Sequence, residues 1–445
     1  MKTKIKKVLR QLRTRFLIPW TKQIEQQEKI VKNLIDANLR NRAVFKQDHN
    51  QAIHVLLVCH TPVLWNMFDS LYRALDKDPD FDVTVAALPY HHGSLPEVAY
   101  KDEGAYEFLK EKGVNVIQGY NKEKDEWLDP AALNADYVFF QTPYRFFPDI
   151  WSIERVSVFA RVCYYPYGIV LENGIIGDIS HPELFLKNTS LFFMEAPLTR
   201  KLFTEKFHNK SWYVDKNVIV SGHPKYDRIK EIENLHGKVW KRGMESDFKR
   251  ILWSTRWRTS EGTCHFFDYK DYFFEFCDNH QDVDFVFRPH PLFSQNFIKT
   301  GEMTFDEQTQ MKKDYDNSPN MFIDMNKDYA DTFMTSDMLI TDLSSLMIEY
   351  LITEKPIIYT HRKNTLNEFG QKLSEGFYWA RNARELDETI SMIISGYDPL
   401  REKRKELMLE LVSMPKEGSG EFIKESLRAN MISHGCSSFE STLFP

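Results

Sequence analysis

The chain has 445 residues, 42% of them hydrophobic, and a net charge of −6 at pH 7. This length allows two or three globular domains, and the acidic balance excludes a general nucleic-acid binder, which would need a basic domain. The five cysteines form no CxxC pair, so the sequence favours a reducing compartment over a zinc site or a disulfide framework. No stretch reaches the roughly 18 apolar residues of a membrane span, and we find no signal peptide.

Residues 1–50 form the first segment, which we expect to be a helical arm. The first 20 residues contain no acid, and apolar residues that include Phe16 and Trp20 alternate with seven bases, namely Lys2, Lys4, Lys6, Lys7, Arg10, Arg13 and Arg15. This pattern is typical of a basic amphipathic helix on an anionic membrane surface, and a solvated basic tail has the same composition. A polar helix over 21–45 with a sparse apolar stripe should dock on the body.

From residue 51 the pattern changes to short apolar strands separated by helices, for example helices 66–75 and 100–112. Such runs predict parallel sheets covered on both faces. The first set of predicted strands is 53–59, 82–88, 115–118, 137–141, 161–165, 191–195 and 217–221. After a charged, helix-like linker at 225–250 the second set is 251–255, 284–288, 321–324, 338–341 and 357–360.

The predicted fold class is therefore α/β, with two doubly wound, Rossmann-like domains that face each other across a cleft. We place the first domain at 51–235 and the second at 236–395. A C-terminal helix, 399–414, and a softer tail complete the segment 396–445.

Polar clusters follow several strands at their carboxyl ends, where ligands bind in such sheets. They contain His223 in SGHPKYD, Arg256 and Arg258 in TRWR, Arg288 and His290 in RPHP, and Asp342, Ser344 and Ser345 in TDLSS. Arginine binds phosphate oxygens through two parallel hydrogen bonds, and the helix predicted over 344–352 would offer free N–H groups at its start. Together they predict a pyrophosphate site, although each cluster alone also fits a turn or a helix cap.

The order GHPKYD, TRWR, RPHP, ITDLSSLMIEYLITEKPIIY resembles the CDP-glycerol glycerophosphotransferase family, the teichoic acid polymerases and primases, over about 217–380. The resemblance implies a GT-B fold with an N-terminal acceptor domain and a C-terminal nucleotide-donor domain. It also implies assembly of a cell-surface polymer at the cytoplasmic face of the membrane. By this resemblance His290 matches the catalytic histidine, Arg258 closes the TWR motif, and Asp342, Ser344 and Ser345 match the donor-phosphate loop. Asp342 is expected to order that loop or to reach a hydroxyl, since a carboxylate repels phosphate.

The sequence departs from the family pattern in the first domain. Family members carry a His-Gly pair regarded as the source of the catalytic base, whereas Tyr167 stands at that position in the segment YYPYGI. A tyrosine with a pKa near 10 is a poor base at pH 7. The nearest substitute is His91 or His92, although a surface turn also fits that pair. Glu349 replaces the usual aspartate, and Arg256 replaces a threonine.

The function predicted from these residues is transfer of a glycerol-phosphate or related alditol-phosphate unit from a CDP-activated donor to a hydroxyl of a polymer or lipid-linked acceptor, with release of CMP. No metal is expected, because the DxD-like strings at 80–82 and 282–284 precede strands and lie away from the cleft. No cofactor is expected either, and the acidic balance argues against nucleic acid. The alternatives are a GT-B glycosyltransferase that uses a nucleotide sugar in capsule synthesis, and a non-catalytic nucleotide-binding partner. The predicted catalytic residues are His290, His92 and Tyr167, and the predicted donor-binding residues are Arg258, Arg256, Arg288, Asp342, Ser344, Ser345 and His223.

Overall fold

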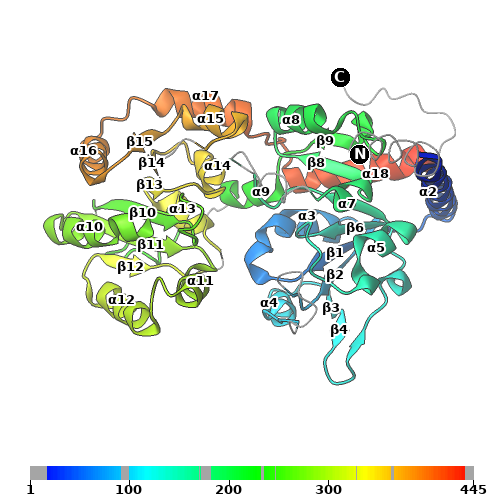
Figure 1. The fold of residues 1–445 in the computed structure, drawn as a ribbon, viewed down its shortest axis with the longest axis horizontal. Helices are drawn as coiled ribbons and strands as arrows, with labels where there is room; N and C mark the ends of the chain where they lie inside the picture. The colour runs from blue at the N-terminus through cyan, green and yellow to red at the C-terminus, as the bar shows by residue number, and fades with distance from the viewer. Residues whose placement is uncertain are drawn as a thin grey trace, which may run out of the picture.

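The computed structural model describes residues 18–91, 100–169, 171, 182–231, 235–245, 247–326, 328–361 and 365–435. The basic segment before residue 18 and the predicted base His92 lie outside these ranges. The described chain forms two α/β domains side by side (Figure 1), one on a seven-stranded sheet and one on a six-stranded sheet. The predicted fold class is confirmed.

The N-terminal sheet has the order β3-β2-β1-β6-β7-β8-β9, and every neighbouring pair in it is parallel. Its strands are β1 (Ile53–Cys59), β2 (Phe81–Ala87), β3 (Val116–Gln118), β6 (Tyr137–Phe140), β7 (Arg161–Tyr164), β8 (Leu191–Met194) and β9 (Val218–Val220). The predicted strands match these within two residues, because each is a continuous apolar run buried by helices on both faces. The associated helices are α3 (Asn66–Asp76), α4 (Ala105–Glu111), α5 (Ile153–Phe159), α7 (Glu183–Lys187), α8 (Pro197–Phe207) and α9 (Pro224–Lys230).

The C-terminal sheet has the order β12-β11-β10-β13-β14-β15, again with parallel pairs throughout. Its strands are β10 (Lys249–Thr255), β11 (Val283–Pro289), β12 (Met321–Ile323), β13 (Met338–Thr341), β14 (Ile357–Thr360) and β15 (Tyr378–Ala380). The helices around it are α10 (Phe266–Asn279), α11 (Phe293–Thr300), α12 (Phe305–Asn317), α13 (Ala330–Thr335), α14 (Leu346–Leu351), α15 (Glu368–Ser374), α16 (Ala383–Ile394) and α17 (Arg401–Leu411).

Both sheets reverse their strand order once, between β1 and β6 and between β10 and β13. Ligands of doubly wound sheets bind in the crevice that opens at such a switch point, beyond the carboxyl ends of the strands. The topology therefore marks one candidate crevice in each domain.

Several predicted elements were wrong in extent. The helix predicted over 100–112 starts only at Ala105, because Gly104 before it has φ +73°, which a helix cannot accommodate. Among its described residues, the linker predicted to be helical over 225–250 is helical only in α9, up to Lys230. The antiparallel hairpin of β4 (Tyr120–Asn121) with β5 (Glu126–Trp127) was not predicted, nor was β15.

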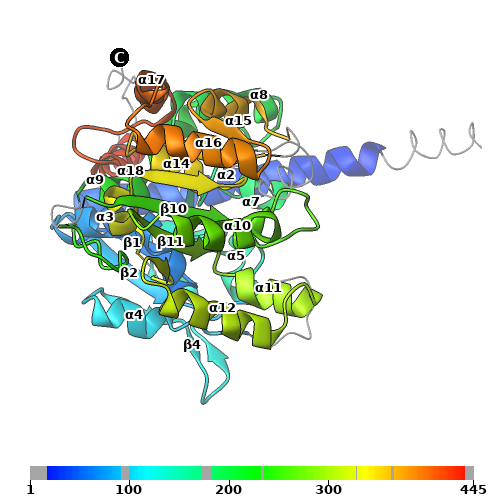
Figure 2. The ribbon, with the colours of Figure 1, turned by 90° about the vertical axis from the view of Figure 1, so that its left-hand side faces the viewer.

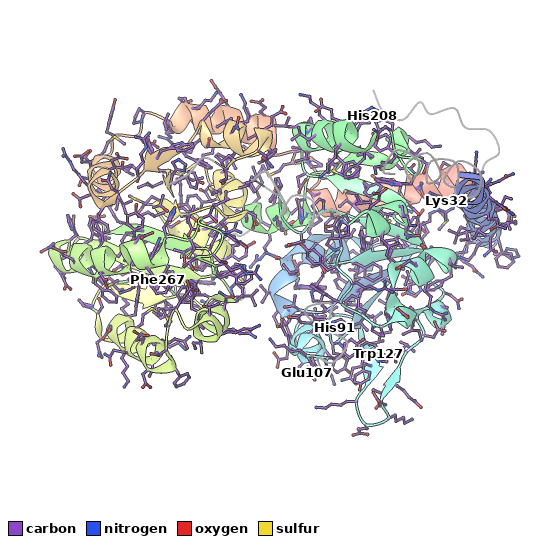
Figure 3. All side chains as sticks on the ribbon, viewed as in Figure 1. Lys32, His91, Glu107, Trp127, His208 and Phe267 are labelled. Atoms are coloured by element: carbon purple, nitrogen blue, oxygen red, sulfur yellow. The ribbon has the colours of Figure 1, made fainter. Side chains whose placement is uncertain are left out.

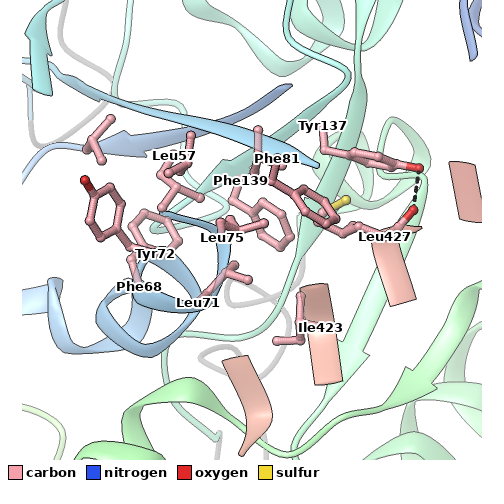
Figure 4. Packing of buried hydrophobic residues seen from close by; sticks show 14 of the residues in the cluster. Leu57, Phe68, Leu71, Tyr72, Leu75, Phe81, Tyr137, Phe139, Ile423 and Leu427 are labelled. Atoms are coloured by element: carbon pink, nitrogen blue, oxygen red, sulfur yellow. Dashed lines mark hydrogen bonds between the residues drawn. The ribbon is translucent and has the colours of Figure 1, made fainter. Parts of the chain in front are cut away.

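The largest correction concerns the C-terminus, where the expected soft tail contains the 17-residue helix α18 (Ser419–Gly435). This helix packs on the N-terminal domain, and Figure 4 shows Ile423 and Leu427 beside Leu71 and Phe139 in its core. The Tyr137 hydroxyl donates to the Leu427 carbonyl at 3.2 Å. The chain thus returns to its first domain after it has completed the second.

The long helix α2 (Ile18–Asp48) docks on the same domain through its last turns. Leu39 and Ala43 are buried there, and the Lys46 ammonium pairs with the buried Asp136 carboxylate at 2.6 Å. Its earlier turns project from the body (Figure 2). Among the described helices, none combines the length and hydrophobicity needed to cross a bilayer.

Replacement of Leu427 tests whether α18 belongs to the N-terminal core. Because Leu427 is fully buried, Leu427→Ala should lower the free energy of unfolding by about 2–5 kcal/mol, measured by urea denaturation. Leu409→Ala on α17 is the matched control, since that side chain is 79% exposed. Equal stability of the two variants would contradict the assigned packing.

Candidate active site

Asp342 lies at the switch point of the C-terminal sheet, between the carboxyl ends of β10 and β13. It follows β13, and its two carboxylate oxygens accept hydrogen bonds from the backbone N–H groups of Arg256 at 2.7 Å and His265 at 3.1 Å. The side chain is fully buried, and this burial raises its pKa to about 7. Asp342 therefore orders the loops after β10 and β13, the first of the two roles expected for it.

The two arginines after β10 differ in how the protein uses them. The Arg256 guanidinium donates to the Leu343 carbonyl at 3.1 Å and to the Glu261 carboxylate, so it joins the two loops. Arg258 lies over the Trp257 ring at 3.8 Å and pairs with the same Glu261 carboxylate at 3.5 Å, and 42% of its side chain is exposed. Of the two, Arg258 is the cation better placed to meet a ligand from solvent.

His290 follows β11 beside these arginines. Its Nδ1 accepts a hydrogen bond from the Leu292 N–H at 3.1 Å, and its ring stacks on Trp257 with centroids 5.5 Å apart. Burial and the charges of Arg256 and Arg258 lower the pKa of His290 to about 3. The neutral ring therefore carries its proton on Nε2, where it can act as a hydrogen-bond donor.

Arg288, another predicted donor-binding residue, is held by contacts within the protein. Its guanidinium pairs with the buried Asp324 carboxylate at 2.6 Å and donates to the Asn326 carbonyl at 2.7 Å. The Asp324 charge offsets that of Arg288, so this pair adds little net positive charge to the crevice.

The loop with Ser344 and Ser345 leads into α14, which spans six residues instead of the nine predicted. So short a helix contributes a weaker dipole than the prediction assumed. Ser345 lies against the other domain, because a Cβ added at Gly168 would meet the Ser345 hydroxyl oxygen at 3.3 Å. The serine loop and the loop at Gly168 are therefore where the two domains approach each other closely.

His223, a predicted donor-binding residue, makes its hydrogen bonds within the protein, and its role toward a donor stays a prediction. Its side chain is fully buried, its Nδ1 accepts from the Lys225 N–H at 3.2 Å, and its Nε2 donates to the Pro166 carbonyl at 2.9 Å. Both ring nitrogens are thus used within the protein, and burial lowers the pKa of His223 well below its ordinary value. The residue fixes the loop that carries Tyr167 and Gly168.

Tyr167 donates to or accepts from the Tyr144 hydroxyl at 3.0 Å. Burial raises the pKa of Tyr167 above that of a free tyrosine, which makes it still less suited to remove a proton at pH 7. His91 is the other described candidate, and its ring packs edge-on against Tyr100. Its backbone N–H donates to the Phe146 carbonyl at 3.1 Å. The catalytic roles of Tyr167, His91 and His92 stay predictions.

A buried polar network joins the domains behind this loop. The Lys225 ammonium pairs with the Glu349 carboxylate at 2.8 Å, with side chains only 3% and 4% exposed, and also donates to the Tyr167 carbonyl at 3.3 Å. The other Glu349 oxygen accepts from the Tyr329 hydroxyl, which accepts from the Asn66 amide at 2.9 Å. One chain of contacts thus runs from α3 through α14 to α9.

The sequence analysis missed the residues at the N-terminal switch point. The Gln141 side-chain oxygen accepts from the His60 and Thr61 N–H groups at 2.8 and 3.2 Å, as Asp342 does in the other domain. The His60 ring packs against Tyr90 and Phe146, and burial lowers its pKa to about 4. The sequence could have revealed these residues by their position at the carboxyl ends of β1 and β6, the first and fourth strands of the seven-stranded sheet in chain order.

Two Rossmann-like domains side by side, with polar side chains at the switch point of each sheet, define the fold as GT-B. Residues 190–379 match the model of the CDP-Glycerol:Poly(glycerophosphate) glycerophosphotransferase family. The resemblance deduced from the motifs is confirmed, and the protein is a CDP-glycerol glycerophosphotransferase-like transferase. The matched range contains the loops with His223, Arg258, His290, Asp342 and Ser345 and ends before α16.

A comparison with curated protein sequences found no match. Among solved structures, the wall teichoic acid polymerase TagF is similar with a TM-score of 0.53 and 14% identity, over 93% of this chain and 98% of TagF. The UDP-GlcNAc 2-epimerase from Neisseria meningitidis bound to UDP-GlcNAc has a TM-score of 0.56 and 12% identity, over 85% of this chain and all of that one. At such identities these likenesses establish the fold alone.

The Lys225–Glu349 pair can be tested by a double-mutant cycle in urea denaturation. Lys225→Met strands the Glu349 charge in the interior and should lower the free energy of unfolding by about 3–5 kcal/mol. Lys225→Met combined with Glu349→Met removes both charges and should recover most of that loss.

The matched control is Lys201→Met, whose partner Glu368 lies 3.6 Å away in an exposed pair. It should change stability by less than about 1 kcal/mol. A Lys225→Met variant no less stable than this control would contradict a buried ion pair at the domain boundary.

Proposed function

We propose that the protein transfers glycerol phosphate, or a related alditol phosphate, from a CDP-activated donor to a hydroxyl of a cell-surface polymer or lipid-linked acceptor, with release of CMP. The observation that carries this proposal is the family match over 190–379, since that one range contains every residue of the donor crevice described above. One of the TagF structures was soaked with CDPG, which supports testing a CDP-activated donor first.

The chemistry would be attack of the acceptor oxygen on the β-phosphorus. A new P–O bond forms, the bond from this phosphorus to the bridging oxygen breaks, and CMP leaves with the electron pair of that bond. The proton of the acceptor hydroxyl passes to a base, for which His91 and His92 are the candidates. Such a transfer needs positioning and charge stabilisation more than covalent help. The Nε2 proton of neutral His290 can donate to the oxygen on which charge builds, and Arg258 supplies positive charge beside it.

This assignment makes a prediction that separates binding from turnover. His290→Ala should lower CMP release from CDP-glycerol by about 10²–10³-fold, because one donor to the developing charge is lost. The same variant should bind CDP or CMP by calorimetry with little change, since Arg258 and the serine loop remain. Ser345→Ala should instead weaken nucleotide binding itself.

The matched control is His208→Ala. His208 lies on the outer surface at the end of α8 (Figure 3), where its Nδ1 is hydrogen-bonded to the Thr204 and Glu205 carbonyls of that helix, so activity should be retained. A fully active His290→Ala variant would contradict the assignment. Wild-type protein that binds UDP or UDP-GlcNAc but no cytidine nucleotide would point to the glycosyltransferase alternative.

We also propose that the basic segment before Trp20 holds the protein on an anionic membrane, at its cytoplasmic face. Each Lys or Arg near such a surface contributes about 1 kcal/mol, so the seven bases of residues 1–15 could suffice without a membrane span. Full-length protein should co-sediment with phosphatidylserine vesicles in low salt, and a chain that begins at Thr21 should not. Equal binding of the two would contradict this proposal.

A further inference from the structure

Most of α2 has no partner within the described chain. The helix is 31 residues long, which corresponds to about 46 Å at 1.5 Å per residue, but only its last turns are docked. Before Leu39 the described side chains other than the half-buried Ile35 face solvent, and Ile30, Val31 and Leu34 are 53%, 54% and 65% exposed. A helix that projects alone into water has marginal stability. We therefore expect these apolar side chains to be covered by a partner.

The exposed face repeats every seven residues. Val31, Asn38 and Phe45 occupy the first position of successive heptads, and Leu34 and Asn41 occupy the fourth, and all five are exposed. In the sequence the same positions continue backwards through Ile24 and Leu17 and through Gln27 and Trp20. Six of these nine positions are apolar, and three are the amides Gln27, Asn38 and Asn41. Apolar residues at alternating spacings of three and four over four heptads are the pattern of a coiled-coil seam.

The polar residues of α2 favour a protein partner over lipid. A helix that lies in a membrane interface has a polar face rich in Lys and Arg, whereas acids and bases are mixed here. Glu28 and Lys32, and likewise Asp36 and Arg40, stand four residues apart in the order that stabilises a solvated helix. The amides of Asn38 and Asn41 within the seam would also be costly in hydrocarbon.

We propose that α2 pairs with α2 of a second copy of this chain in a parallel, two-stranded coiled coil. A second copy fits because the seam is self-complementary when the helices are in register, which sets Val31 on Val31 and Leu34 on Leu34. An Asn at the first heptad position specifies register and favours two strands, because the two amides hydrogen-bond across the seam. A parallel pair also brings both N-terminal basic segments to the same end of the dimer.

Cysteine cross-linking of the full-length chain tests the register. Four native cysteines are buried, and Cys436 lies outside the described residues, so Cys436→Ser is the background. Under mild oxidation Val31→Cys should form a disulfide-linked dimer. Lys29→Cys, two residues away on the outer face of the proposed pair, should remain monomeric on denaturing gels.

Sedimentation velocity gives an independent measure of the assembly. Wild type should be dimeric, and Leu34→Asp should raise its dissociation constant by more than about 100-fold, because two charges would meet in the seam. Lys32→Asp makes a larger change in charge at a heptad position outside the seam and should leave the dimer intact.

Two outcomes would overturn the proposal. One is wild type that stays monomeric at tens of micromolar with no Val31→Cys cross-link. The other is monomeric wild type that binds phosphatidylserine vesicles and loses that binding in Leu34→Asp, which would assign the seam to lipid.

Discussion

The buried ion pair between Lys225 and Glu349 is the constraint on which the arrangement of the two domains depends. Two charges removed from water are stable only when each is paired and hydrogen-bonded, and here they lie at the domain boundary. Lys225 also holds the Tyr167 carbonyl, and Glu349 lies on α14 directly after the serine loop. The loop with Tyr167 and the serine loop are therefore positioned by the same pair of charges.

Electrostatics explains why a histidine at the crevice can serve as a donor instead of a base. Burial beside Arg256 and Arg258 keeps His290 neutral, and the Leu292 N–H occupies its Nδ1, which leaves the Nε2 proton for a ligand. The charge of Asp342 would repel phosphate, but its carboxylate is buried and accepts hydrogen bonds from two backbone N–H groups. The crevice thus presents cations and N–H donors, which suits an anionic donor.

Much of the fold follows from the sequence, because buried parallel strands are continuous apolar runs and polar clusters after them fall on one rim. Contacts between distant residues do not follow, and Lys225 and Glu349 are separated by 124 positions. His223 appeared to be a ligand from its place after β9, yet its surroundings bury it. In α18, Ile423, Leu427 and Met431 recur every four residues as in a helix, but nothing local shows that their partner is the N-terminal core.

The central proposal is that the protein directs attack at the β-phosphorus of a CDP-activated donor. Phosphorus-31 NMR of CDP-glycerol incubated with the protein and a polyglycerol-phosphate acceptor observes this bond directly. The account predicts that the pyrophosphate signals give way to one phosphodiester signal and one CMP monoester signal. Release of intact CDP, or pyrophosphate signals that persist with a protein that binds the donor, would contradict it.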